Sequence, residues 1–126
     1  MRLLLDTVTF IWAVTTPERL SRAAMSALRK GTAVREISVV SLTEIAVKQS
    51  RGKLTLAGAD VMTGVTDLRL RIVPYTTEHA FHLFDLPRHH ADPFDRQIIA
   101  QALVENIAVV TPDEAFRLYE GVKVIW

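Results

Sequence analysis

The chain has 126 residues, of which 49% are hydrophobic and 23% are charged, and this composition is typical of a globular protein rather than a disordered one. There are 15 Lys and Arg against 14 Asp and Glu, so the net charge of +1 excludes a protein that coats nucleic acid by bulk positive charge. Cysteine is absent, which excludes disulfides, thiolate metal sites and cysteine nucleophiles. We expect a single domain over residues 1–126, long enough to bury an ordinary core.

The N-terminus resembles a signal peptide only superficially. Arg2 precedes an apolar run at 3–5, but Asp6 interrupts that run and no small-residue cleavage pattern follows. No stretch reaches the roughly 18 apolar residues that a membrane span needs. We therefore expect a soluble, cytoplasmic protein without a membrane partner.

Short apolar segments alternate with longer amphipathic segments along the chain. Short runs rich in Val, Ile and Leu are typical of strands that are buried on both faces of a parallel sheet. The alternation predicts an α/β fold with helices on both faces of the sheet and right-handed crossovers. The expected strands cover 2–5, 37–40, 71–73, 107–110 and 122–125, and the expected helices cover 7–14, 19–30, 41–51, 58–69, 77–85, 93–105 and 112–119.

Three of the expected helices begin with capping sequences. Ser41 and Glu44 have the spacing of a capping box, which predicts a helix that starts at Ser41. Asp92 precedes a proline, so we expect Asp92 to be the N-cap and Asp95 the third helical residue. Residues 111–114, Thr-Pro-Asp-Glu, have a similar form, with proline at the first helical position.

These helix starts bring acidic residues to the carboxyl ends of strands. One carboxylate in a first helical turn is usually explained by the helix dipole, which it offsets by a few tenths to about 1 kcal/mol. Here Asp6 ends the first expected strand, Glu44 follows the second and Asp113 follows the fourth. The carboxyl ends of parallel strands form one crevice where ligands bind, and Asp95 begins a helix that can reach it.

Gathered carboxylates repel one another, by on the order of 4 kcal/mol for two unit charges about 4 Å apart at an effective dielectric constant of 20. A hard divalent cation offsets this repulsion. Oxygen ligands without cysteine favour Mg²⁺ or Mn²⁺ over zinc. Because Mg²⁺ held by a few carboxylates and several waters is typical of phosphoryl-transfer sites, the acids predict that kind of site.

The acids lie in four motifs: Leu-Leu-Leu-Asp6-Thr, Ser41-Leu-Thr-Glu44-Ile-Ala, Asp92-Pro-Phe-Asp95-Arg-Gln-Ile-Ile-Ala-Gln-Ala and Val-Val-Thr111-Pro-Asp113-Glu-Ala-Phe116. In order and spacing, from Arg2 to Trp126, they resemble PIN domains, and more narrowly the toxin nucleases of bacterial VapBC toxin–antitoxin pairs. The resemblance implies a three-layer α/β/α sandwich with a five-stranded parallel sheet. It also implies Mg²⁺- or Mn²⁺-dependent endoribonuclease activity on RNA, a cognate antitoxin partner and a homodimer.

The same resemblance implies roles for individual residues. By residue-to-residue match, it implies that the catalytic metal ligands are Asp6, Glu44, Asp95 and Asp113. Thr111 matches a hydroxyl residue that often precedes the last acid. Asp92 is expected to cap its helix or to support the ligands, rather than to bind the metal itself.

Several basic residues and histidines near these acids have two interpretations each. Lys48 either forms an ion pair with Glu44, one turn away, or joins a basic rim with Arg51 and Lys53 that holds the RNA backbone. Arg96 either pairs with a neighbouring acid or contacts phosphate. His89 and His90 precede Asp92 in an expected loop, so one of them is a candidate for the pocket rim. His79 and His82 lack an evident third metal ligand, which favours packing or surface roles.

Three other functions are open to a sequence of this kind. A haloacid-dehalogenase-like phosphatase also begins with a strand that ends in Asp, but its second Asp would stand where this chain has Val8. A nucleotide-binding module would need a glycine-rich phosphate loop, and none is present. The third alternative is a non-catalytic PIN relative that binds RNA or an antitoxin, against which the four intact acids argue.

Overall fold

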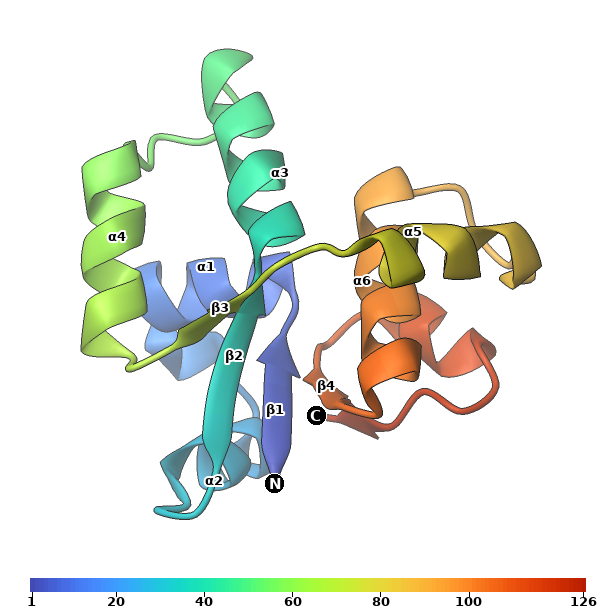
Figure 1. Cartoon of the computed structure of the whole chain (residues 1–126). Helices are drawn as coiled ribbons and strands as arrows, with labels where there is room; N and C mark the ends of the chain where they lie inside the picture. The colour runs from blue at the N-terminus through green and yellow to red at the C-terminus, as the bar shows by residue number, and fades with distance from the viewer.

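A parallel sheet of five strands lies at the centre of the molecule, in the order β3-β2-β1-β4-β5 (Figure 1). The computed structural model describes the whole of residues 1–126. The strands are β1 (Arg2–Leu5), β2 (Val34–Ser38), β3 (Arg71–Val73), β4 (Ala108–Val110) and β5 (Val124–Ile125). Every neighbouring pair runs parallel, which confirms the expected α/β fold.

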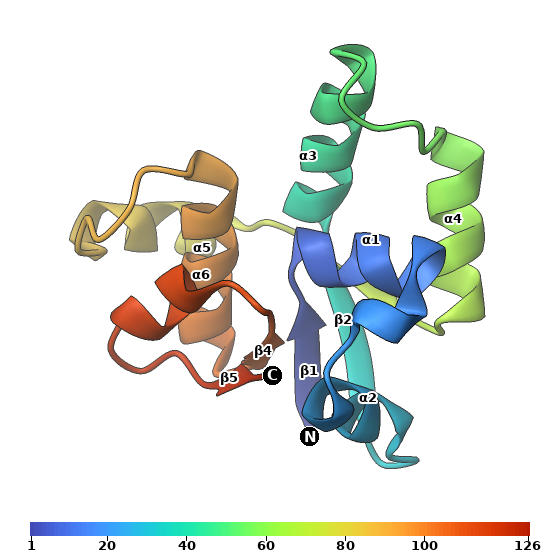
Figure 2. The same ribbon diagram turned by 180° about the vertical axis from the view of Figure 1, so that it is seen from behind.

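Helices cover both faces of this sheet, as expected for a three-layer sandwich. They are α1 (Thr7–Thr15), α2 (Arg22–Arg29), α3 (Val39–Ser50), α4 (Gly58–Asp67), α5 (Thr77–His82) and α6 (Pro93–Glu105). Figures 1 and 2 show α1 and α4 on one side of the sheet and α5 and α6 on the other, while α3 continues from the carboxyl end of β2. None of these helices has the length and apolar character needed to cross a membrane.

The three leucines of β1 show why the central strands are continuously apolar. Leu4 faces the α6 side, where it joins a core cluster that contains Ile98. Leu5 points the other way and packs with Phe10 of α1, and Leu3 faces the α2 side of the sheet. All three side chains are buried, because alternate residues of a strand point to opposite faces and both faces are covered by helices.

The junction between β2 and α3 differs from the expectation. The predicted strand at 37–40 is displaced, since β2 ends at Ser38, and the predicted capping box at Ser41 is wrong, because α3 begins at Val39 with Ser38 as its N-cap. The Ser38 hydroxyl accepts a hydrogen bond from the Val40 amide at 3.0 Å. The two β-branched valines that suggested a strand therefore form the first helical turn. Ser41 consequently lies inside the helix, where it is buried.

Two other expected helices are shorter than their patterns suggested. The expected helix 19–30 is shortened at its start, because a 3₁₀ turn, Pro17–Arg19, ends there and α2 begins only after Ser21, which caps it by accepting from the Ala24 amide. The segment 112–119 contains only a 3₁₀ helix, Glu114–Leu118, whose N-cap is Asp113, so Pro112 lies before the helix and not at its first position as expected. A further 3₁₀ helix, Leu83–Asp85, follows α5.

Candidate active site

A pocket of about 350 Å³ at the carboxyl ends of the strands is lined by acidic side chains. It is formed by Asp6, Thr7, Val8, Ile11, Trp12, Glu44, Lys48, Leu54, Asp92, Asp95 and Asp113. The four acids expected to act together therefore share one pocket, and Asp92 lies beside them. They come from the end of β1, from α3, from the start of α6 and from the segment after β4, which meet only in the folded chain.

Asp6 is the most deeply placed of these carboxylates, with 2% of its surface exposed. It is the N-cap of α1, and its Oδ1 accepts a hydrogen bond from the Thr9 amide at 2.9 Å. The Thr111 hydroxyl donates to Oδ2 at 2.6 Å. Burial raises the pKa of Asp6 to about 6 although these hydrogen bonds oppose the shift, and the nearby charge of Asp113 raises it further.

Glu44 is buried in α3 and is held from two sides. The Thr7 hydroxyl donates to Oε1 at 2.6 Å and also contacts the Ser41 hydroxyl at 2.9 Å. Lys48 forms an ion pair with Oε2 at 2.8 Å, which is one of the two roles considered for it. This contact raises the pKa of the Lys48 ammonium. Glu44 therefore lines the pocket with its charge already paired with the Lys48 ammonium.

The two aspartates at the start of α6 have different environments. Asp92 is exposed and caps the helix, since its Oδ1 accepts from the Phe94 amide at 2.9 Å and from the Asp95 amide at 3.1 Å. The capping role expected for Asp92 is therefore confirmed. Asp95 is largely buried, and burial together with the charges of the other four acids raises its pKa to about 8.

Asp113 is exposed at the pocket and caps the 3₁₀ helix that follows it. Its Oδ1 accepts from the Ala115 amide at 2.9 Å, and its own amide donates to the Thr111 hydroxyl at 3.0 Å. Thr111 therefore links the last acid to the first, because the same hydroxyl donates to Asp6.

A family model of the PIN domain matches residues 3–122. The chain belongs to the PIN domain family. This confirms the resemblance to PIN domains. No curated protein matches the sequence.

Solved structures of toxin–antitoxin proteins share the PIN fold of this chain. VapBC2 of Rickettsia felis, bound to a DNA fragment of its promoter, matches with a TM-score of 0.74 and 16% identity, over 98% of this chain and 97% of that chain. DNA-bound VapBC of Salmonella typhimurium matches with a TM-score of 0.67 and 21% identity, over 98% and 96% of the two chains. FitAcB of Neisseria gonorrhoeae matches with a TM-score of 0.60 and 20% identity, over 97% and 95%. At these identities the likeness concerns the fold.

The basic residues considered for RNA binding occupy three different settings in this PIN domain. Lys48 lines the acidic pocket. Arg51 and Lys53 are exposed just beyond the end of α3. Arg96 pairs with no acid, because its guanidinium donates to the carbonyl oxygens of Pro87 at 2.8 Å and Leu86 at 3.2 Å.

The histidines of the PIN domain also separate clearly. His79 is buried, with Nε2 2.8 Å from Glu105, and its Nδ1 accepts from the Thr76 amide at 3.0 Å, so it has the packing role expected for it. His90 instead lies beside the pocket, with Nε2 3.3 Å from Asp95 Oδ2. Sequence reasoning left His90 undecided and missed Thr7, although a hydroxyl directly after the first acid was a usable signal.

Proposed function

We propose that this PIN domain is a Mg²⁺- or Mn²⁺-dependent endoribonuclease that acts as the toxin of a toxin–antitoxin pair. The observation that carries the proposal is the convergence of five carboxylates on one pocket, two of them with pKa values raised by burial and mutual repulsion. Membership of the PIN family and the fold shared with VapBC proteins support it. An RNA-cleaving toxin of this kind would act in the cytoplasm.

The donor set of the pocket fits a hard divalent cation, because every candidate ligand is a carboxylate oxygen. No group of three or more side chains is arranged so that it could hold a metal ion as it stands. A ready-made cage is not required, since Mg²⁺ keeps several waters and binds proteins through one or two carboxylates. We assign Asp6, Glu44, Asp95 and Asp113 as the residues that would hold the ion directly or through water.

The chemistry that a bound Mg²⁺ or Mn²⁺ supplies is polarisation of a phosphate oxygen and activation of a water molecule. The protein's own hydroxyl groups orient the acids for this purpose. Thr111 holds Oδ2 of Asp6, and Thr7 holds Oε1 of Glu44. Trp12 and Leu54 line the same pocket with apolar side chains. We place the RNA backbone along Lys48, Arg51 and Lys53, at the α3 side of the pocket.

Product analysis tests this reaction. Attack by water breaks the bond between phosphorus and the 3′ oxygen, so we expect fragments with 5′-phosphate and 3′-hydroxyl ends. Cleavage of total cellular RNA should require Mg²⁺ or Mn²⁺ and stop in EDTA. A 2′,3′-cyclic phosphate end, or full activity in EDTA, would contradict the mechanism. A pure preparation that binds RNA or an antitoxin without cutting RNA would identify the non-catalytic alternative.

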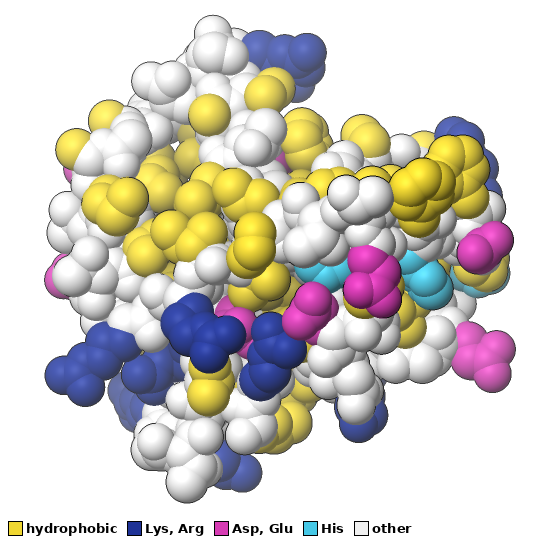
Figure 3. Space-filling view, viewed as in Figure 1, with side chains coloured by type: hydrophobic (Ala, Val, Ile, Leu, Met, Phe, Trp, Pro, Cys, Tyr) yellow, Lys and Arg dark blue, Asp and Glu magenta, His cyan; other side chains and the backbone are white.

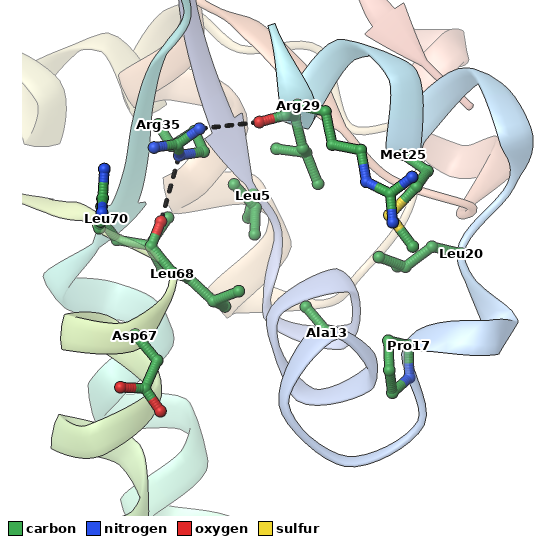
Figure 4. Close-up of a pocket in the computed structure, with 12 residues that line it drawn as sticks. Leu5, Ala13, Pro17, Leu20, Met25, Arg29, Arg35, Asp67, Leu68 and Leu70 are labelled. Atoms are coloured by element: carbon green, nitrogen blue, oxygen red, sulfur yellow. Dashed lines mark hydrogen bonds between the residues drawn. The ribbon is translucent and has the colours of Figure 1, made fainter. Parts of the chain in front are cut away.

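Two surfaces outside the acidic pocket, one mostly apolar and one that mixes apolar and charged side chains, support protein partners. One is a groove of about 270 Å³ between α3 and α4, lined by Leu42, Val61 and the exposed Met62 among others. Figure 3 shows hydrophobic side chains gathered over this region. The other is a pocket of about 320 Å³ among α1, α2 and the end of α4, where Arg35 donates to the carbonyl oxygens of Leu28 and Leu68 (Figure 4).

We propose that these surfaces are covered by a cognate antitoxin and by a second copy of this chain. Exposed apolar patches usually mark interfaces, and a similar chain from Klebsiella pneumoniae comes from a structure described as a toxin–antitoxin complex. Sedimentation at tens of micromolar should show a dimer, and co-expression with the product of a neighbouring gene should yield a complex that no longer cleaves RNA. A monomer would contradict the dimer, and a neighbouring gene without a small DNA-binding product would contradict the pair.

A further inference from the structure

His90 contacts two groups of different chemistry through its two ring nitrogens. Its Nε2 lies 3.3 Å from Oδ2 of Asp95, and its Nδ1 lies 2.8 Å from the hydroxyl oxygen of Tyr119. A neutral imidazole carries its hydrogen on one nitrogen and accepts on the other. The effect of His90 on the acidic pocket therefore depends on whether Nε2 or Nδ1 carries the hydrogen.

Arg96 fixes the direction of the hydrogen bond between Tyr119 and His90. Its Nη1 lies 3.1 Å from the Tyr119 hydroxyl oxygen and 2.8 Å from the carbonyl oxygen of Pro87. A guanidinium can only donate, so the Tyr119 oxygen accepts from Arg96 and must give its own hydrogen to another group. That group is Nδ1 of His90, the other hydrogen-bond partner of this hydroxyl.

The opposite arrangement would leave a buried donor unsatisfied. Tyr119 is 2% exposed, so its O–H cannot turn to bulk water if Nδ1 carries a hydrogen. With Nδ1 as acceptor, the neutral ring carries its hydrogen on Nε2, facing Asp95. The other carboxylate oxygen of Asp95, Oδ1, makes no hydrogen bond within the protein. It is not fully buried, so it can contact solvent.

We propose that His90 is a positioning residue for Asp95, held in the Nε2–H tautomer by a hydrogen-bond relay from Arg96 through Tyr119. The relay holds Oδ2 of Asp95 with a donor and leaves Oδ1 free to face a divalent cation. This inference rests on the proposed function, because it takes Asp95 as a metal ligand. It also gives Arg96 a role on the protein side of the pocket rather than on RNA.

Nitrogen NMR of protein labelled with ¹⁵N-histidine tests the relay without reference to activity. At pH 8.5 in EDTA we expect His90 to show a hydrogen on Nε2 and none on Nδ1. Loss of its signals in H90Q provides the assignment. Tyr119→Phe should shift His90 towards a mixture of tautomers. Tyr75→Phe is the matched control, because the buried Tyr75 hydroxyl has no hydrogen-bond partner, and it should leave His90 unchanged.

Either of two results would overturn the relay: an Nδ1–H tautomer in the natural protein, or a His90 spectrum that does not respond to Tyr119→Phe. The consequence for the pocket is tested by Mn²⁺ binding. His90→Leu should weaken Mn²⁺ binding about tenfold, as expected when a residue that orients a ligand is lost. His90→Gln should retain most of the affinity, because its side-chain amide can still donate to Asp95.

Comparison of the variants separates positioning from packing and from a failure of the proposed function. His89→Gln is the control next in sequence, since His89 contacts Tyr119 through ring edges and makes no hydrogen bond to Asp95. It should bind Mn²⁺ as the natural protein does. Equal loss in His90→Leu and His90→Gln, or no loss in His90→Leu, would contradict positioning. If the natural protein itself binds no Mn²⁺, the proposed function fails, whereas the tautomer result still reports on the relay.

Discussion

Acids of one residue type take different roles in this pocket because their surroundings differ. Asp92 and Asp113 are exposed, and in each of them Oδ1 accepts a hydrogen bond from a backbone amide at the start of a helix. Asp6 and Asp95 are withdrawn from solvent, so burial raises both of their pKa values. A buried carboxylate with a raised pKa is costly unless a cation or a proton accompanies it, which distinguishes Asp95 from its neighbour Asp92.

Replacing each aspartate at the start of α6 by asparagine separates the cap from the proposed ligand. Asparagine still caps a helix but is a poorer metal ligand. Asp95→Asn should lower cleavage by more than about 100-fold, the upper range for losing a residue that only supports a ligand. It should also weaken Mn²⁺ binding while the Tm stays level or rises, since one of the repelling charges is gone.

The matched variant is Asp92→Asn, which we expect to retain substantial cleavage and Mn²⁺ affinity. Cleavage assays, calorimetric titration with Mn²⁺ and thermal melts of both variants provide the comparison. A dead Asp92→Asn together with a normal Asp95→Asn would reverse the assignment of the two residues.

At the scale of elements, close packing of α1 against α4 fixes how the first helix, capped by Asp6, sits on the sheet. Gly64 is buried in α4, and a Cβ atom placed there would lie 2.6 Å from Cγ2 of Val14 and 3.2 Å from the Phe10 ring. Glycine is unfavourable inside a helix by roughly 1 kcal/mol relative to alanine. The close approach of the two helices therefore explains a residue that helix propensity alone disfavours.

Gly64→Ala should destabilise the protein although it improves helix propensity. Overpacking costs about 1–3 kcal/mol and exceeds the propensity gain of about 1 kcal/mol, so we expect a net loss of up to about 2 kcal/mol. Gly58→Ala, at the start of the same helix, is the control, because a Cβ there would meet nothing within 4 Å. Urea denaturation measures the free energy of unfolding of both variants. A Gly64→Ala variant as stable as Gly58→Ala would show that α1 and α4 do not pack this closely.

At the scale of the whole molecule, the acids gathered at one end of the sheet tie stability to pH and to cations. The pKa values of Asp6 and Asp95 are raised to about 6 and about 8, so the folded protein retains protons that the unfolded chain has released. Their contribution to stability is complete below the unfolded pKa of about 4, and it is lost as pH rises through the folded values.

In EDTA the Tm should therefore fall as pH rises from 6 to 8.5. Millimolar Mg²⁺ should raise the Tm, and more strongly at pH 8.5 than at pH 6, because the ionised carboxylates bind the cation and the protonated ones do not. In the Asp95→Asn variant the Tm should depend much less on pH. Thermal melts across the pH series measure the Tm of both proteins. A Tm in EDTA that rises steadily through this range would contradict the clustering of charge.

The sequence alone was sufficient for the alternation of strands and helices, the parallel sheet and the four acids that share the pocket. Continuous apolar strands such as 3–5 and 107–110 can be recognised in the sequence because both faces of a parallel sheet are buried. Asp92 can be recognised as a helix cap because proline follows it. These signals are local, so they survive without knowledge of the fold. The acids were recognisable because strand ends of a parallel sheet meet at one edge.

Tertiary structure decided the features that depend on distant neighbours. Helix α3 begins at Val39 rather than Ser41, because Ser38 supplies the cap and Ser41 is drawn into contact with Thr7. The hydrogen bonds of Asp6 with Thr111 and of His90 with Tyr119 join residues that are far apart in the chain. Such partners share no local pattern; folding brings them together, and burial then determines which hydrogen bonds they form and how strongly their pKa values shift.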